Sequence, residues 1–214
     1  TMMQFSSNDV VVFDLDDTLY KEIDFLKSAY KEISGTFGLD VSAEMFEVYR
    51  RGGNAFKYII ERYNLKTDIS SLLTQYRQHT PAIELDKDAR DFLDLLREYG
   101  VTIGIISDGR SVTQRNKIKA LGLEWIENVI ISEEFGSAKP SIANYQWFEQ
   151  KFPNKNLTYI GDNVSKDFIA PNSLGWNTIC LKDDGRNVHK QDFTFPKEYM
   201  PKVVIDGFRD LLCF

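Results

Sequence analysis

Residues 10–18 read VVVFDLDDT, and this stretch decides the fold because an apolar run leads directly into an acidic segment. Val10 to Phe13 is short, apolar and rich in β-branched residues, which is typical of a strand buried on both faces. Later segments share this character: Val101 to Ile106, Asn128 to Ile131, Leu157 to Ile160, Thr178 to Leu181 and, as a last edge strand, Val203 to Ile205. The first strand is therefore expected to join a sheet whose other strands come much later in the chain.

From about residue 85 onward, amphipathic stretches alternate with these apolar runs. Residues 89–99 carry apolar side chains at helical spacing, and residues 111–121 are polar with Ile118 and Leu121 on one side. Helices that connect consecutive strands imply a parallel sheet covered on both faces. The sequence therefore predicts an α/β fold with a doubly wound, Rossmann-like parallel sheet.

Residues 20–84 break this alternation, because they show helical periodicity and no convincing strand. Helices are expected around residues 25–33, 56–63 and 72–76, with loops near Gly35 to Gly38 and at Gly52-Gly53. We interpret this segment as a small all-helical domain inserted into a core made of residues 1–19 and 85–214. The polar stretch 183–201 is expected to be a loop.

Polar residues follow the predicted strands at the points where the strands end. In an open parallel sheet, ligands bind outside the carboxyl ends of the strands, so these residues are the first candidates for a site. The candidates are Asp14 and Asp16 after the first strand, Ser107 and Asp108 after the second, Lys139 in the loop after the third, and Asp162 after the fourth.

Converging carboxylates repel one another, so a site that holds several of them near neutral pH usually has a cation or raised pKa values. Oxygen ligands suit a hard ion, and Mg2+ prefers few carboxylates together with waters and substrate phosphate. Lys139 would supply a positive charge for a phosphoryl oxygen, and Ser107 a hydrogen-bond donor. The pattern indicates phosphoryl transfer with Mg2+ as cofactor.

In this order, the residues resemble the motifs of the haloacid dehalogenase-like hydrolase superfamily, from Val10 to about Trp176. Residues 14–18 match its first motif, Ser107 the second, Lys139 the third, and residues 161–167 the fourth. The resemblance implies that Asp14 is the nucleophile and forms an aspartyl-phosphate. It also implies that the helical insertion is a cap that closes over the site.

The resemblance gives the remaining acids distinct roles. Asp16 would protonate the leaving oxygen and later deprotonate the hydrolytic water. Mg2+ would lie between Asp14, the main-chain carbonyl of Asp16, Asp162 and the phosphate. Asp167, the second acid of the fourth motif, would hold a metal-bound water or orient Lys139, while Ser107, Asp108 and Lys139 would contact the phosphate.

The acid at position 16 also favours one reaction class within the superfamily. A phosphate ester needs a proton for its departing alkoxide, whereas carbon–halogen cleavage releases a stable anion and needs none. Asp16 therefore favours a phosphatase or a phosphomutase over a dehalogenase. Asp17, the neighbouring acid, is expected to hydrogen-bond local backbone.

Structural roles are also possible for several of these residues. Ser107 or Asp108 could cap a helix that begins near residue 110, and Lys139 before Pro140 could belong to a helix entry. Asp162 could be a turn acid, and Asp167 could sit at a helix N-terminus. Cap residues that could contact substrate flank the glycine pair: Arg50, Arg51, Asn54 and Lys57. The two histidines, His79 and His189, are isolated and receive no role.

Composition restricts the partners. The chain has 214 residues and a formal net charge of −6, and the absence of a basic tract argues against nucleic acid or an anionic membrane as the main partner. Two cysteines without metal-ligand spacing, Cys180 and Cys213, suit free thiols in a reducing compartment, so a cytoplasmic location is expected. No segment approaches a membrane span. The expected partner is a small phosphorylated metabolite, and the oligomeric state is not readable.

The sequence leaves two alternatives to a phosphatase. A phosphomutase would share the nucleophile and the acid but return the phosphoryl group to the substrate. A non-catalytic phospho-accepting domain, like a response-regulator receiver, would also combine acids, a hydroxyl and a lysine on a parallel sheet. In receivers, however, the accepting aspartate follows a later strand and has no acid two residues beyond it.

Overall fold

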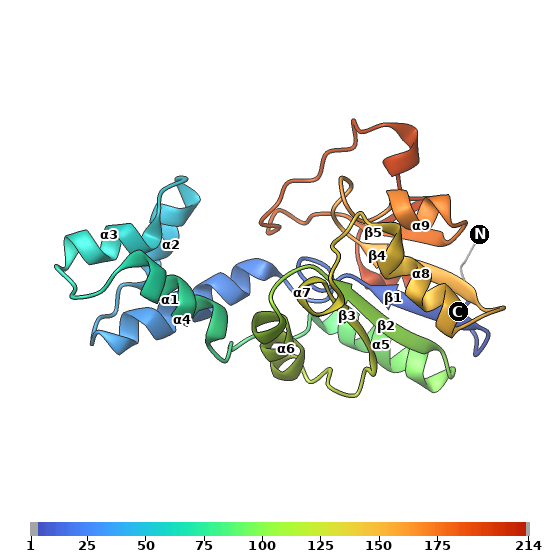
Figure 1. Ribbon diagram of the computed structural model, residues 1–214, viewed down its shortest axis with the longest axis horizontal. Coiled ribbons are helices and arrows are strands. Elements are labelled where there is room, and N and C mark those ends of the chain that lie inside the picture. Colours follow the sequence, from blue (N-terminus) through green and yellow to red (C-terminus); the bar gives the residue numbers. More distant parts are fainter. Residues whose placement is uncertain (1–3, 213–214) are drawn as a thin grey trace.

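A six-stranded, wholly parallel sheet forms the centre of the protein in the computed structural model, which describes residues 4–212. The strand order is β3-β2-β1-β4-β5-β6 (Figure 1). The strands are β1 (Asp9–Phe13), β2 (Thr102–Ser107), β3 (Asn128–Ile131), β4 (Asn156–Gly161), β5 (Asn177–Leu181) and β6 (Val203–Ile205). The predicted strands coincide with these to within one residue at each end, and the predicted α/β fold class is confirmed.

Two layers of helices cover the sheet because successive side chains of each strand point to opposite faces. Val11 and Phe13 of β1 belong to a hydrophobic cluster with α5 (Lys87–Glu98) and α6 (Ser111–Ala120). Val10 and Val12 belong to a second cluster with α8 (Ile142–Lys151) and α9 (Ile169–Ser173). Burial on both faces explains why the strands appear in the sequence as unbroken apolar runs.

The segment between β1 and α5 folds into four helices that extend away from the sheet on one side (Figure 1). They are α1 (Glu22–Thr36), α2 (Ser42–Arg50), α3 (Ala55–Arg62) and α4 (Ile69–Gln78). These helices share a hydrophobic cluster of their own, whose fully buried members include Ile33, Met45 and Ile59. Helix α2 was not anticipated, because Met45 is its only buried residue. Helix α1 continues through Gly35, where a loop was expected.

The long connection between β5 and β6 reaches from the sheet toward the helical insertion (orange to red in Figure 1). Apart from the short 3₁₀-helix η1 (Lys197–Tyr199), it lacks helix and strand, as expected for residues 183–201. Val188 in this loop packs against the hydrophobic cluster of the insertion. Beyond β6, the described part of the chain ends in a second 3₁₀-helix, η2 (Phe208–Leu211).

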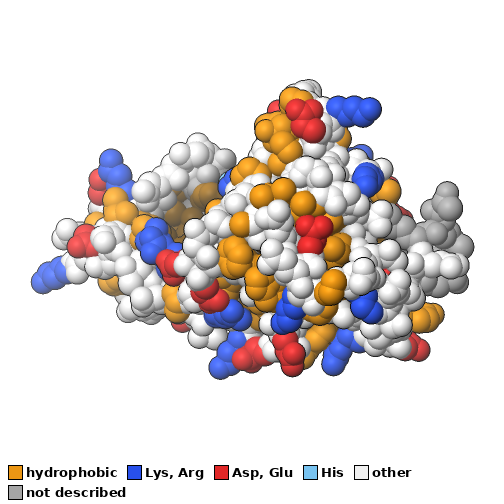
Figure 2. All heavy atoms as spheres, turned by 45° about the vertical axis from the view of Figure 1, so that its right-hand side comes forward, with side chains coloured by type: hydrophobic (Ala, Val, Ile, Leu, Met, Phe, Trp, Pro, Cys, Tyr) orange, Lys and Arg blue, Asp and Glu red, His pale blue; other side chains and the backbone are white. Residues whose placement is uncertain are grey.

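Several sequence-based expectations concern the surface and the thiols. Lys, Arg, Asp and Glu side chains are interspersed on the face drawn in Figure 2, without a large patch of one sign. Within residues 4–212, no helix combines the length and apolarity that crossing a membrane requires. Cys180 is a buried free thiol, and Cys213 lies outside the described residues.

Two further pieces of secondary structure complete the core. Helix α7 (Ser132–Phe135) is a single turn that follows β3 directly and ends at Gly136 in a left-handed conformation. Lys139 lies in the loop that follows this turn, on the carboxyl side of β3. The peptide bond between Lys139 and Pro140 is cis, and α8 begins only at Ile142, with Ser141 as its N-cap. Pro140 therefore lies outside the first turn of the helix.

Candidate active site

The candidate site lies where the sheet's strand order reverses. β1 pairs with β2 on one side and with β4 on the other, so the chain winds outward in opposite directions from this point. Asp14 follows β1 and its backbone N–H donates to the carbonyl of Ile160 at 2.9 Å. Asp162 follows β4 at the same edge. A crevice at such a reversal is the usual ligand site of open α/β sheets, and here it is a pocket of about 160 Å³.

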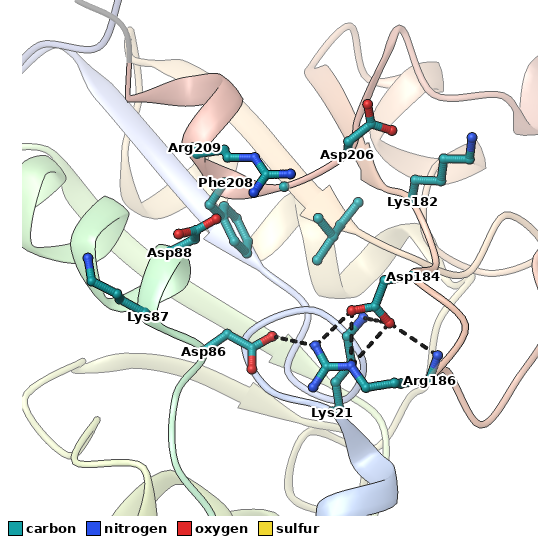
Figure 3. Close-up of a pocket in the computed structure, with 12 residues that line it drawn as sticks. Lys21, Asp86, Lys87, Asp88, Lys182, Asp184, Arg186, Asp206, Phe208 and Arg209 are labelled. Atoms are coloured by element: carbon teal, nitrogen blue, oxygen red, sulfur yellow. Dashed lines mark hydrogen bonds and ion pairs between the residues drawn. The ribbon is translucent and has the colours of Figure 1, made fainter.

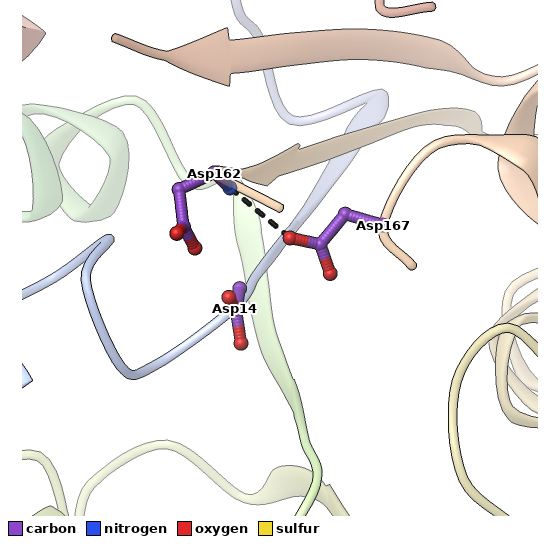
Figure 4. Close-up of side chains that lie close together, drawn as sticks. All are labelled: Asp14, Asp162 and Asp167. Atoms are coloured by element: carbon purple, nitrogen blue, oxygen red, sulfur yellow. Dashed lines mark hydrogen bonds between the residues drawn. The ribbon is translucent and has the colours of Figure 1, made fainter. Parts of the chain in front are cut away.

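Three carboxylates converge at the base of this pocket. Oxygen atoms of Asp14, Asp162 and Asp167 lie within 4.8 Å of one another, and all three residues are buried (Figure 4). Burial and the nearby Asp167 raise the pKa of Asp14 to about 7. Burial, followed by Asp14 and Asp167, raises the pKa of Asp162 well above its ordinary value. Like charges crowded out of water are costly, so the cluster has the chemistry of a cation site.

The three acids are not equivalent. Oδ1 of Asp167 accepts hydrogen bonds from Lys139 Nζ at 2.8 Å and the Tyr159 hydroxyl at 3.2 Å. Its Oδ2 accepts from the backbone N–H groups of Asp162 at 3.1 Å and Asn163 at 2.8 Å. Both oxygens of Asp167 are therefore occupied by donors, whereas Asp162 accepts one hydroxyl bond, from Thr18 at 3.1 Å. This arrangement suits Asp167 to hold the loop and Lys139 in place, and leaves Asp14 and Asp162 better able to bind a cation.

A glycine permits this close approach. A Cβ atom at position 161 would lie 2.5 Å from Oδ2 of Asp167, which is shorter than real contacts allow. Gly161 ends β4 immediately before Asp162. The absence of a side chain at this point is therefore required for Asp167 to fold back over the fourth-strand loop.

Lys139 reaches the cluster from the loop before α8. Its Nζ lies 2.9 Å from Asp14 Oδ1 and 2.8 Å from Asp167 Oδ1, and its side chain is buried. Burial would lower the pKa of Lys139, but Asp14 and Asp167 outweigh burial and raise it well above its ordinary value. Asp108 accepts a hydrogen bond from the Lys139 backbone N–H at 3.0 Å, so it positions this loop and caps no helix.

Ser107 and Asp16 are joined by a second network that arises from α6. Gln114 Nε2 donates to Ser107 Oγ at 2.6 Å and to Asp16 Oδ2 at 2.9 Å. Lys117 Nζ lies 2.8 Å from Asp16 Oδ1, and the Tyr20 hydroxyl donates to the same oxygen at 2.5 Å. Ser107 does not cap α6, whose N-cap is Arg110.

The electrostatic state of Asp16 follows from these contacts. Burial raises the pKa of Asp16, but the Lys117 ammonium and the hydrogen bonds from Lys117, Tyr20 and Gln114 hold it below its ordinary value. Asp16 lines the pocket but is not part of the three-carboxylate cluster. In this arrangement, Asp16 is held as a carboxylate.

Asp17 contacts backbone only, in agreement with the expectation that it serves as scaffold. Its Oδ1 accepts from the N–H of Glu22 at 3.0 Å and its Oδ2 from the N–H of Val188 at 2.9 Å. Its φ of 60° places it in the left-handed region, which aspartate tolerates better than most residues. Asp17 thus fixes the start of α1 and the loop after β5 to the segment that carries Asp14 and Asp16.

The cap residues suggested by sequence are not brought to the pocket. Arg50 pairs with Glu47 at 3.5 Å and Lys57 with Glu61 at 4.0 Å, all on exposed helix surfaces. Asn54 is the N-cap of α3, with its side chain accepting from two backbone N–H groups. Arg51 follows α2 and is exposed.

Sequence reasoning missed other residues that line the pocket, namely Glu22, Asn163, Lys166 and His189. Burial and Asp16 raise the pKa of Glu22, the first residue of α1, to about 8. The α6 network was missed as well, although a signal existed: α6 has few apolar positions, and its buried residues include the polar Gln114 and Lys117. A polar helix that is nevertheless buried must have partners for its side chains.

Known proteins resemble this chain at several levels. The model of the haloacid dehalogenase-like hydrolase family matches residues 11–181. A glyceraldehyde 3-phosphate phosphatase of Methanocaldococcus jannaschii is 26% identical over 204 residues, which cover 86% of this chain and 90% of that protein. A ribulose-1,5-bisphosphate 5-phosphatase of Halopiger xanaduensis is 27% identical over 200 residues, covering 80% and 83% of the two chains.

Solved structures share the fold at lower sequence identity. The HAD-hydrolase YfnB of Bacillus subtilis, in a form bound to magnesium, superposes with a TM-score of 0.68 at 17% identity, covering 95% of this chain and 96% of that one. A HAD phosphatase of Thermococcus onnurineus superposes with a TM-score of 0.59 at 20% identity, covering 95% of each chain. At such identities the superpositions establish the fold alone.

Proposed function

The chain belongs to the haloacid dehalogenase-like hydrolase family, and on that premise we propose that it is a magnesium-dependent phosphatase acting through an aspartyl-phosphate on Asp14. The observation that carries the proposal is the contact of Lys139 Nζ with Asp14 Oδ1 at 2.9 Å, beside Asp162 and Asp167. A carboxylate is a competent nucleophile toward phosphorus only where positive charge offsets its repulsion from the phosphate. The pocket places that positive charge next to Asp14.

Attack by Asp14 forms a bond between its carboxylate oxygen and phosphorus while the ester bond to the leaving alkoxide breaks. One oxygen of Asp14 is held by Lys139 and by the Leu15 backbone N–H at 2.8 Å, which fixes the orientation of the carboxylate. We assign Ser107 and Lys139 to the phosphoryl oxygens: Lys139 lines the pocket, and Ser107 lies behind it in contact with Gln114. Asp108 positions Lys139 through its backbone. Such prior positioning lowers the entropic cost of the attack.

Asp16 is proposed to move the protons. In the first step its carboxyl group gives a proton to the leaving oxygen, and in the second it takes a proton from the water that attacks the aspartyl-phosphate, which releases phosphate and restores Asp14. The carboxylate form favoured by Lys117 suits the second step. For the first step Asp16 must be protonated, and release of its contact with Lys117 when substrate binds would favour that form.

The residues present fit Mg2+, since buried, mutually repelling oxygen ligands with raised pKa values favour a hard cation. We assign Asp14, Asp162 and the main-chain carbonyl of Asp16 as its ligands, with Asp167 organising the loop. A bound Mg2+ would offset the negative charge that accumulates between nucleophile and phosphate. The ion would also lower the electrostatic cost of keeping Asp14 and Asp162 ionised.

Residues 20–84 are proposed to act as a cap domain over a catalytic core of residues 1–19 and 85–214. α1 begins with Glu22 at the rim of the pocket, so movement of the helices α1 to α4 would change access to it directly. Closure of such a cap excludes water and allows Asp16 to exchange partners. The small pocket and the named relatives favour a small phosphorylated metabolite, such as a sugar phosphate, as substrate. A cytoplasmic location remains a prediction.

Replacing Asp14 by Asn tests this function. The variant keeps the shape of the side chain but removes the nucleophile, so hydrolysis of p-nitrophenyl phosphate with Mg2+ should fall on the order of a thousandfold or more. Asp94→Asn, which removes an exposed carboxylate on α5, is the matched control and should retain parental activity. Parental activity in Asp14→Asn would overturn the mechanism. Comparing phosphate release with isomer formation on sugar phosphates separates a phosphatase from a phosphomutase.

A further inference from the structure

Apart from the acid Glu22, the charged side chains that line the active-site pocket fall into two groups. Those at its base are all engaged: Lys139 with Asp14 and Asp167, Asp162 with Thr18, and Asp16 with Lys117. Lys166 and His189 differ, because neither side chain makes a hydrogen bond or ion pair within residues 4–212. They are also the only lining residues besides Lys139 that can present a positive charge.

Lys166 is held at the pocket by a well-ordered turn. It lies between Asp162 and Asp167, and its backbone N–H donates to the Asn163 carbonyl at 3.1 Å. Within the same turn, the Ser165 N–H and hydroxyl donate to Asn163 Oδ1 at 3.1 and 2.7 Å. The backbone of Lys166 is therefore fixed next to the metal-site acids while its exposed side chain remains available to a ligand.

His189 is placed by a loop that is anchored on both sides of it. The Val188 N–H donates to Asp17 Oδ2 at 2.9 Å, and Gln191 Nε2 donates to the carbonyl of Asp162 at 2.8 Å. Lys21 Nζ donates to Asn187 Oδ1 at 2.8 Å, which ties the same loop to the start of the insertion. The loop thus docks on the first and fourth motifs and presents His189 to the pocket.

A second cavity, of about 320 Å³, is lined in part by Asp184 and Arg186, which precede His189 in the same loop (Figure 3). There, Arg186 lies 2.7 Å from Asp184 and 3.5 Å from Asp86, so its charge is already matched by carboxylates. Lys21 Nζ, which also lines that cavity, donates to Asn187 Oδ1 and lies 3.9 Å from Asp184 Oδ1. Lys182 and Arg209 line that cavity without a side-chain hydrogen bond or ion pair within residues 4–212, as Lys166 and His189 do in the active-site pocket. Lys166 and His189 differ from them because they line the pocket that holds Asp14 and Lys139.

We propose that Lys166 and His189 form a subsite for a carboxylate of the substrate, so that the enzyme acts on a small phosphoester of a carbon acid. This inference rests on the proposed function, since it assigns the part of the substrate that is not transferred. Lys139 and the metal-site residues meet the charge of the phosphoryl group, and the two remaining donors can meet a second anion. A carboxylate fits better than a second phosphate, because seven acidic residues line the same pocket and repel a dianion more strongly.

Competition with p-nitrophenyl phosphate hydrolysis tests the subsite without requiring that the competitor be turned over. The probes are 3-phosphoglycerate and glycerol 3-phosphate, which differ in a carboxylate replacing a hydroxymethyl group. The parental enzyme should bind 3-phosphoglycerate about tenfold more tightly, as expected for one charge-assisted contact at a partly exposed site. Lys166→Met should remove most of this preference, His189→Gln part of it, and Lys166→Arg should retain it.

Lys190→Met is the matched control, because it removes an exposed positive charge from the same loop without lining the pocket. It should leave the preference unchanged. The subsite would be overturned if both probes inhibited the parental enzyme equally. It would also be overturned if Lys166→Met and Lys190→Met lost the preference for 3-phosphoglycerate to the same extent. Failure of the phosphatase assignment is distinguishable, since p-nitrophenyl phosphate would then not be hydrolysed, or Asp14→Asn would remain active.

Discussion

The sheet core and the helical insertion bury different kinds of side chain. Among the described residues, every buried Asp or Lys lies outside α1 to α4: Asp9, Asp14, Asp17, Lys21, Lys117, Lys139, Asp162 and Asp167. Helices α1 to α4 bury apolar and aromatic residues together with Ser34, and their own ion pairs, such as Arg50–Glu47 and Lys57–Glu61, are exposed. The helices of the insertion therefore pack like an ordinary small hydrophobic core. The sheet core buries charged groups, and their burial lowers its stability.

This contrast places the candidate reactive groups, which are buried charged side chains, in the sheet core. Buried charges are expensive and persist only when partners or ions compensate them. The core provides such partners along two routes, Lys139 for Asp14 and Asp167, and Lys117 for Asp16. Helices α1 to α4 contribute apolar packing and, among the residues that line the pocket, only Glu22, which would suit the proposed role of a cap that covers the site without reacting.

The largest expected effect comes from Asp162→Asn in the core. Loss of one carboxylate from the proposed metal site should lower kcat/KM with Mg2+ on the order of a thousandfold. Without metal, the same variant should be more stable than the parent near pH 8 by about 1–2 kcal/mol, since it removes a crowded charge. Urea unfolding with chelator, and then with added Mg2+, measures both the gain and the loss of metal-induced stabilisation.

The pH dependence of the parent protein's stability tests whether the carboxylate cluster is destabilising in the absence of metal. The pKa of Asp14 is raised from 3.8 to about 7 by burial and Asp167, so the folded state holds this proton more tightly than the unfolded state. Stability of the metal-free protein should therefore fall as pH rises from about 4 to about 7, and the raised pKa values of Asp162 and Glu22 extend the fall above that. A metal-free protein whose stability rises over this window would contradict the idea that the cluster is costly without a cation.

The next prediction concerns two equally buried isoleucines, one in the insertion and one in the sheet core. Ile33 in α1 and Ile105 in β2 are both fully buried, and truncation of either to Ala should cost about 2–4 kcal/mol through lost packing and a cavity. Ile33→Ala should lower amide hydrogen-exchange protection mainly in α1 to α4 and leave stabilisation by Mg2+ intact. Ile105→Ala should lower protection across the sheet. Equal loss of protection in both regions in both variants would show that the insertion is not a distinct cooperative unit.

Sequence patterns predicted the sheet and the location of the site, for physical reasons that apply to particular residues. Strands buried on both faces appear as apolar runs, so β1 and β4 were visible, and the carboxyl ends of parallel strands must meet. Asp14 and Asp162 could therefore be placed together without coordinates. Lys139 was found because it follows the third strand. Of the two roles that the resemblance implied for Asp167, the structure shows the contact with the ammonium group of Lys139.

The α6 network and the loop after β5 could not be obtained in this way. Gln114 and Lys117 reach Asp16 across 98 and 101 residues of sequence, and such contacts depend on how α6 packs on the sheet, which periodicity does not specify. His189 reaches the pocket because the Val188 N–H donates to Asp17 Oδ2 and Gln191 Nε2 donates to the carbonyl of Asp162, which docks an irregular loop. An irregular loop has no periodic signal, and a single histidine in it carries no pattern.

A smaller effect is expected where the charge of the core meets the insertion. Lys117 lies 2.8 Å from Asp16, and its Nζ also lies over the ring of Phe25 in α1, 4.4 Å from the centroid. Lys117→Met should cost about 2 kcal/mol at neutral pH, because it leaves Asp16 buried without its cation. The pKa of Asp16 is lowered in the folded state, so this cost should shrink as pH falls through the ordinary carboxyl pKa. Gln114 and Tyr20 would still contact Asp16.

Measuring urea unfolding of Lys117→Met and the parent from about pH 3 to pH 7 tests this pair. Lys119→Met, on the same helix but exposed, is the control and should behave as the parent. A cost in Lys117→Met that is independent of pH would mean that the lysine contributes through its aliphatic contacts, such as those with Phe25, and not through its charge.

The smallest effects are expected in the insertion's surface charges, where sequence had suggested substrate contacts. Arg50→Ala and Lys57→Ala each remove an exposed pair, and pairs of this kind contribute roughly 0–1 kcal/mol. Both variants should unfold within about 0.5 kcal/mol of the parent and keep kcat/KM within about twofold, because neither side chain lines the pocket. If either one lowered kcat/KM tenfold without a change in stability, closure of the insertion must carry that residue to the substrate. The proposed division, in which the sheet core holds the reactive residues and the insertion only covers them, would then apply only to the arrangement of the two regions in this structure.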